Sequence, residues 1–103
     1  MDEMCDRDGN HLRLKSTFNV RSDQARVLFT GWVQEALAEE PEVLIVDFTR
    51  LTVLTSTIIA MTHLACGLAA RQKARVEVVV HPNHRTGFGI IKRPTVLSVR
   101  YSA

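Results

Sequence analysis

The chain has 103 residues, the length of one ordinary domain, and 46% of them are hydrophobic, which is enough for one packed core. Its apolar stretches are shorter than the about 18 residues of a membrane-spanning helix, and residues 1–6 are acidic rather than apolar as in a signal peptide. We therefore expect a cytoplasmic protein without membrane insertion. The net charge of +2 is unevenly spread, because residues 1–10 hold four acids and one base, whereas residues 71–103 hold seven bases and one acid.

The two cysteines do not indicate a metal or redox centre. Cys5 and Cys66 are far apart in the chain and form no CxxC motif. We expect no disulfide between them, since free thiols persist in the cytoplasm. Cys66 is predicted to be a small core residue.

The first third of the chain predicts a hairpin and then a helix. Asp8-Gly9-Asn10 is a turn signal, with a short edge strand before it. The strand after it alternates through Leu12 and Leu14 and is extended in this prediction to Phe18 and Val20. Ser22 or Asp23 is the expected N-cap of a helix that ends before Pro41. Apolar residues recur in it at i, i+3, i+4, i+7 and i+8 from Ala25 onward, and they include Trp32, a predicted core residue.

The rest of the chain alternates between strands and helices. The apolar run 43–48 predicts a central strand buried on both faces. A helix is expected at about 56–72, where Gly67 suggests a close contact with the sheet. Residues 76–80 predict a strand, residues 84–93 a short helix weakened by two glycines, and residues 96–101 a last strand.

This order predicts the fold class. Strands that alternate with helices favour an α/β domain with a mostly parallel sheet. We expect residues 1–103 to form a single domain of about four to five strands with two main helices and a short third.

No motif points to catalysis or to a bound cofactor. The chain lacks GxGxxG, GxxxxGK[ST] and HExxH, and Ser56 has no GxSxG around it. His81 and His84 are near neighbours without an obvious third ligand. We therefore predict no catalytic residue, no cofactor and no metal site.

The hydroxyl cluster Thr55-Ser56-Thr57 is the most informative candidate site. It follows the predicted central strand and lies at the expected start of the second helix. One interpretation is structural: a hydroxyl there caps the helix, a contribution of roughly 1 kcal/mol. The other is regulatory, because a phosphate is accommodated by the positive end of the helix dipole and changes the charge presented to a partner.

The segment 43–60, VLIVDFTRLTVLTSTIIA, resembles the STAS domain (sulphate transporter and anti-sigma-factor antagonist). Asp47-Phe48-Thr49 matches the end of the family's apolar strand, Val53-Leu54 matches its apolar pair, and Ser56 falls on its phosphorylated serine. Thr55 stands where the family carries an acid, and Thr57 and Ile58 stand where it carries a small residue and glycine. The order of the remaining helices and strands also matches the family.

The resemblance implies a non-enzymatic protein-interaction module similar to an anti-sigma-factor antagonist or a stress-signalling scaffold. The implied partner is an anti-sigma factor or a switch kinase, and Ser56 is the implied phosphoacceptor, with Thr55 or Thr57 as substitutes. The implied docking surface is the start of the second helix with the loop before it. Its residues are Arg50, Thr52, Val53, Thr55, Ser56, Thr57, Ile59 and His63.

Four alternatives remain open from the sequence. The domain could be an accessory subunit of a lipid or anion transporter, a small ligand binder or enzyme with its site at the strand ends, or a homodimer paired through its first strand. It could also bind nucleic acid, although few aromatic residues lie among its bases. That hypothesis uses Arg71, Lys73, Arg75, Arg85, Lys92, Arg93 and Arg100.

Overall fold

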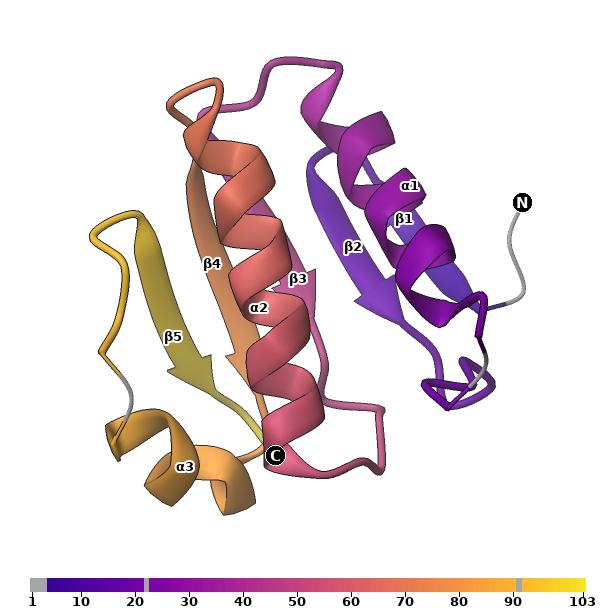
Figure 1. Cartoon of the computed structure of the whole chain (residues 1–103), viewed down its shortest axis with the longest axis vertical. Coiled ribbons are helices and arrows are strands. Elements are labelled where there is room, and N and C mark those ends of the chain that lie inside the picture. Colours follow the sequence, from indigo (N-terminus) through magenta and orange to yellow (C-terminus); the bar gives the residue numbers. More distant parts are fainter. Residues whose placement is uncertain (1–3, 22, 91) are drawn as a thin grey trace.

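The structure, a computed structural model, describes residues 4–21, 23–90 and 92–103. It is an α/β domain with one five-stranded sheet, two main helices and a short third helix (Figure 1). The strands lie in chain order and are parallel except for the first pair, so the predicted fold class is confirmed. The elements are β1 (Cys5–Asp8), β2 (His11–Leu14), α1 (Ala25–Leu37), β3 (Val43–Asp47), α2 (Thr55–Ala70), β4 (Arg75–Val80), a 3₁₀ turn η1 (Pro82–His84), α3 (Arg85–Ile90) and β5 (Leu97–Tyr101).

The hairpin of β1 and β2 follows from the turn at Gly9. Gly9 has a φ of 60°, which glycine adopts without the steric cost that a Cβ would bring. The strand β2 nevertheless ends at Leu14, because a turn follows in which the N–H of Phe18 donates to the carbonyl of Lys15 at 3.0 Å. The predicted extension of the strand to Phe18 and Val20 is therefore wrong, although Phe18 is buried.

The first helix starts later than its expected cap. Its N-cap position is Gln24, which makes no side-chain capping bond, and Asp23 is exposed before it. The alternative cap, Ser22, lies outside the described residues. The apolar spacing is confirmed, since the residues of α1 at these intervals are buried, Trp32 among them with 8% exposure, apart from Leu28, which is partly buried against the core.

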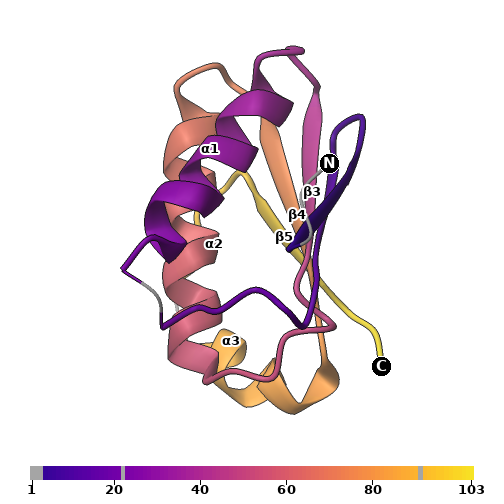
Figure 2. The same cartoon turned by 90° about the vertical axis from the view of Figure 1, so that its right-hand side faces the viewer.

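The sheet is covered on one face only. Figure 2 shows α1 and α2 side by side on the same face, with the other face free of helices. Along β3, Leu44 and Val46 are buried, whereas Val43, Ile45 and Asp47 are only partly buried. The prediction that this strand is buried on both faces is therefore wrong. The open face instead carries ion pairs between neighbouring strands, such as Arg13–Asp47 at 3.8 Å and Arg100–Glu77 at 3.5 Å.

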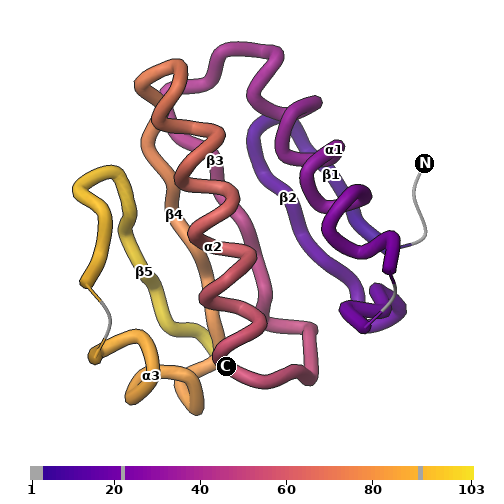
Figure 3. Tube along the Cα trace, in the orientation of Figure 1, coloured from indigo at the N-terminus to yellow at the C-terminus, as the bar shows by residue number. Residues whose placement is uncertain are grey.

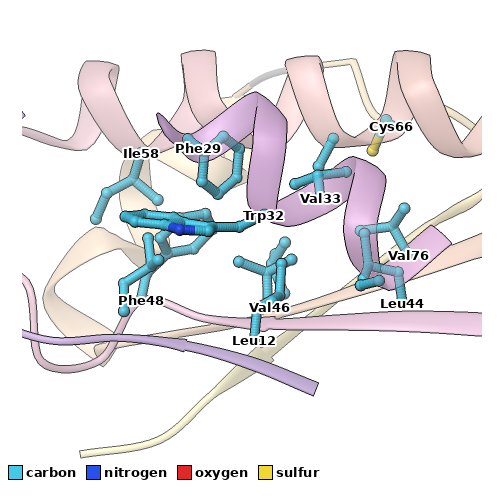
Figure 4. Close-up of a cluster of buried hydrophobic side chains, with 14 of the residues drawn as sticks. Leu12, Phe29, Trp32, Val33, Leu44, Val46, Phe48, Ile58, Cys66 and Val76 are labelled. Carbon is cyan, nitrogen blue, oxygen red and sulfur yellow. The ribbon is translucent and has the colours of Figure 1, made fainter. Parts of the chain in front are cut away.

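The core lies between the sheet and the two main helices (Figure 4). Phe29 and Phe48 pack with their ring centroids 6.1 Å apart, and Ile58 of α2 is fully buried beside them. Cys66 is buried in this core as predicted, and burial raises the pKa of its thiol to about 11. Both cysteines are free thiols.

Gly67 makes no close contact, contrary to expectation. It is exposed in α2, and a Cβ built there meets nothing within 4 Å. The close contact is made by Gly87 of α3, where a Cβ would lie 2.5 Å from Cγ2 of Thr55. The trace in Figure 3 shows why, since α3 lies at the end of the sheet next to the first turn of α2.

Candidate functional site

The site begins where β3 ends. The carboxylate of Asp47 accepts hydrogen bonds from the N–H of Thr49 at 2.8 Å and from its hydroxyl at 2.6 Å. The N–H of Phe48 donates to the carbonyl of Val79 at 2.8 Å, and that of Leu51 donates back to Phe48 at 3.0 Å. These bonds turn the chain out of the sheet and direct residues 49–54 toward the start of α2.

The helix α2 starts at Thr55, so the three hydroxyl residues occupy its first three positions. The N-cap is Leu54, which is extended (φ −66°, ψ 145°) and makes no side-chain capping bond. The capping interpretation is therefore wrong, because none of the three hydroxyls occupies the N-cap position. The first turn also contains no acidic residue. Its N–H groups and its positive dipole end have no side-chain counterpart there.

Thr55 is fixed by η1 and α3. Its hydroxyl oxygen lies 2.6 Å from Nδ1 of His84, and its methyl group packs on Gly87. His84 is 6% exposed, and its burial, followed by the charge of His81, lowers its pKa below the ordinary value of 6.5. Ile59, one helical turn after Thr55, lies on the same side toward Gly87. Thr55 and Ile59 therefore hold α2 and α3 together.

Ser56 differs from both of its neighbours. It is exposed, whereas Thr55 and Thr57 are partly buried. Of the three candidate phosphoacceptors, Ser56 is thus the one whose hydroxyl is open to an approaching enzyme.

Thr57 faces two hollows on the α1 side of α2. The first, which we name the α1–α2 groove, has a volume of about 480 Å³ and runs between the start of α1 and the first half of α2. The second, which we name the loop hollow, has a volume of about 420 Å³ and lies between residues 16–21 and the loop before α2. Phe18, Val20 and Thr57 line both of them, so the two hollows adjoin.

The expected docking residues divide between the two sides of α2. Thr52 and Val53 line the loop hollow, and His63 lines the α1–α2 groove. Arg50 is exposed in the loop. Thr55 and Ile59 instead face α3, so they support the surface rather than form it.

The sequence did not identify the residues that complete the site. His84 and Gly87 lie about thirty positions after Thr55, and no local pattern links them to it. Phe18 and Arg26 line the hollows because the turn after β2 and the first turn of α1 come next to α2. Only the folded chain brings these segments together.

Of the basic residues of the last third, Arg85 and Arg93 both contact Tyr101. Arg75 is the first residue of β4, Arg85 follows the other end of that strand, and Arg100 is paired with Glu77. Of the two aromatic residues in that part of the chain, Phe88 is fully buried and the ring of Tyr101 lies under Arg85, with 4.7 Å between the guanidinium carbon and the ring centroid. Bases would need an open ring to stack on, so the arrangement offers little to a nucleic acid.

Comparisons with known proteins give no relative. No family model, no curated protein and no solved structure matches the chain. Among the described residues, no helix is long and apolar enough to cross a membrane.

Proposed function

We propose that this chain is a non-enzymatic, cytoplasmic protein-interaction module of the kind that the STAS resemblance implies. It binds its protein partner through the start of α2 and the two adjoining hollows. A phosphate on Ser56 switches the binding off. The partner is the anti-sigma factor or switch kinase that the resemblance suggests.

The observation that carries this proposal is the position of Ser56. It is exposed at the second position of a helix whose first turn has neither a capping side chain nor an acid. A phosphate there carries a charge of about −1.5 to −2 and meets favourable N–H groups, so the modification is compatible with the helix. It also changes the charge of the surface next to Thr57, where the two hollows adjoin.

The exposed apolar surface supports binding of a protein rather than catalysis. Leu54 is 71% exposed at the N-cap, two positions before Ser56, and partly buried apolar residues line both hollows. Apolar area that is left open beside a polar rim is typical of interaction surfaces. The alternative of a transporter subunit uses the same surface without phosphorylation, and no separate observation favours it.

The test compares Ser56→Asp with Ser56→Ala. Each tagged variant is used to capture partners from the native cells, and mass spectrometry reads both the partners and the phosphosites. We expect Ser56→Ala to retain the partner. Ser56→Asp should bind it at least about tenfold more weakly, a change in binding free energy of about 1.4 kcal/mol. Ser102→Asp is the matched control, because Ser102 is exposed after β5 and lines neither hollow. Equal capture by Ser56→Asp and Ser56→Ala would refute the switch.

A further inference from the structure

The α1–α2 groove has a helix-packing surface that no described part of the chain covers. From α2 it is lined by Thr57, Ala60, Met61 and Leu64, which follow one another at i, i+3, i+4 and i+7. Side chains at this spacing form one ridge on a helix, and a second helix packs against such a ridge. Ala60 is exposed, and Met61 and Leu64 are partly exposed although they pack against the core, so part of this ridge stays open beside α1.

The composition of α2 agrees with this. Its sixteen residues include no Asp, Glu, Lys or Arg, and His63 is its only titratable side chain apart from the buried Cys66. A helix on the surface of a domain normally carries charges on its outer face. The outer face of α2 is therefore suited to contact with another apolar surface.

Two arginines lie on the rim of the two hollows. Arg26 and His63 line the groove, Arg21 lines the loop hollow, and no Asp or Glu is among the residues that line either of them. Among the described residues, neither Arg21 nor Arg26 takes part in an ion pair. An occupant with carboxylates on both sides of an apolar stripe matches this distribution, since opposite charges fix orientation and suppress wrong partners.

We propose that the α1–α2 groove binds an acidic amphipathic helix of the protein partner. Apolar side chains at i, i+3, i+4 and i+7 of that helix pack on the ridge from Thr57 to Leu64, and its flanking Asp and Glu side chains face Arg26 and Arg21. This inference rests on the proposed function and names the chemistry of the partner. It also explains the direction of the switch, because a phosphate on Ser56 adds negative charge beside a surface that attracts an acidic helix.

The direct test uses a synthetic helical peptide of about 18 residues, with leucines at the four anchor positions and glutamates beside them, and a second peptide in which lysines replace the glutamates. Met61 lies in the groove and Met4 lies directly before β1, where its carbonyl accepts from the N–H of Lys15, so methyl-labelled methionine gives a reporter and an internal control in the same NMR spectrum. We expect the glutamate peptide to shift the Met61 methyl signal saturably and to leave Met4 in place. The lysine peptide should bind at least about tenfold more weakly.

Two substitutions locate the binding on the groove. Ala60→Glu places bulk and negative charge on the lining of the groove and should weaken binding of the glutamate peptide at least about tenfold. Ala70→Glu is the control: it makes the same change at an exposed position at the other end of α2 and should leave binding of the peptide unchanged. Arg26→Glu should reverse the preference between the two peptides. Binding that is insensitive to Ala60→Glu would overturn the proposal.

Other occupants give different results in the same spectrum. A Met61 shift that depends on the concentration of the protein alone would identify a second copy of the chain. A shift produced by decanoate and by neither peptide would identify an anionic amphiphile. Either result, or no response of Met61 to the glutamate peptide, would overturn the proposal.

The partner captured through the Ser56 experiment separates the two proposals. If Ser56→Asp releases it and Ala60→Glu retains it, the groove is not its binding site, and only the Ser56 switch of the proposed function stands. Ala60→Glu could instead weaken binding of both the peptide and the captured partner, while Ser56→Asp and Ser56→Ala capture equal amounts of the partner. In that case the groove is the binding site and the phosphate switch is wrong.

Discussion

The first two turns of α2 are closed on one side and open on the other. Toward α3, the hydroxyl of Thr55 is bonded to the buried His84 and its methyl group rests on Gly87. Toward α1, Thr57 and Met61 border a groove of about 480 Å³. The contrast teaches that neighbouring hydroxyls of one cluster have different tasks: Thr55 fixes the helix, and Ser56 and Thr57 belong to the surface that the fixed helix presents.

The open side depends on the core beneath it, and this gives the largest expected effect. The ring of Phe18, which lines both hollows, packs edge-on against Trp32 with 5.1 Å between centroids. Trp32→Ala should lower the free energy of unfolding by about 3–5 kcal/mol, because it removes a large buried ring. Urea denaturation measures this. Val27→Ala on the same helix is the control, since Val27 is 68% exposed and should change stability by less than about 0.5 kcal/mol. An unchanged urea midpoint for Trp32→Ala would mean that the packing of Phe18 on Trp32 does not stabilise the residues that line the groove.

Two glycines with different surroundings test the contact between α3 and the start of α2. Gly87→Ala forces a Cβ into the methyl group of Thr55 and should destabilise the fold by about 1–3 kcal/mol. Gly67→Ala adds a Cβ in open space within α2 and should stabilise it by about 1 kcal/mol. In thermal melting, Gly87→Ala should lower the melting temperature relative to the wild type, and Gly67→Ala should raise it. A stabilising Gly87→Ala would show that α3 does not press on the start of α2.

Local patterns predicted the elements but not their surroundings. The turn at Gly9 and the spacing in α1 depend on residues close in the chain, so the sequence carries them. The apolar run of β3 led to the wrong burial of that strand, because an apolar run does not reveal whether helices cover one face or two. The coverage depends on where both main helices lie, which is a property of the whole chain.

The same limit applies to the candidate site. The exposed position of Ser56 next to an apolar helix follows from local sequence, and it agrees with the expected docking surface. The capping role was wrong because Leu54, an apolar residue, occupies the N-cap. The partner of Thr55 was missed because His84 lies beyond β4, and no period or motif connects residues so far apart.

The closed side also predicts a small dependence of stability on pH. The lowered pKa of His84 means that the native state keeps its ring neutral at a pH where the unfolded chain binds a proton. The free energy of unfolding should therefore fall as the pH drops below about 6.5, with a slope of at most about 1.4 kcal/mol per pH unit for this one group. Above that pH the contribution is constant, since His84 is neutral in both states.

Urea midpoints of the wild type and of His84→Gln, measured between about pH 7 and pH 5.5, test this dependence in the window where the ordinary histidine titrates. The wild type should lose stability more steeply on acidification than the variant, whose glutamine does not titrate in this range. Equal slopes would mean that the folded chain does not lower the pKa of His84 and that its burial beside Thr55 does not make protonation costly.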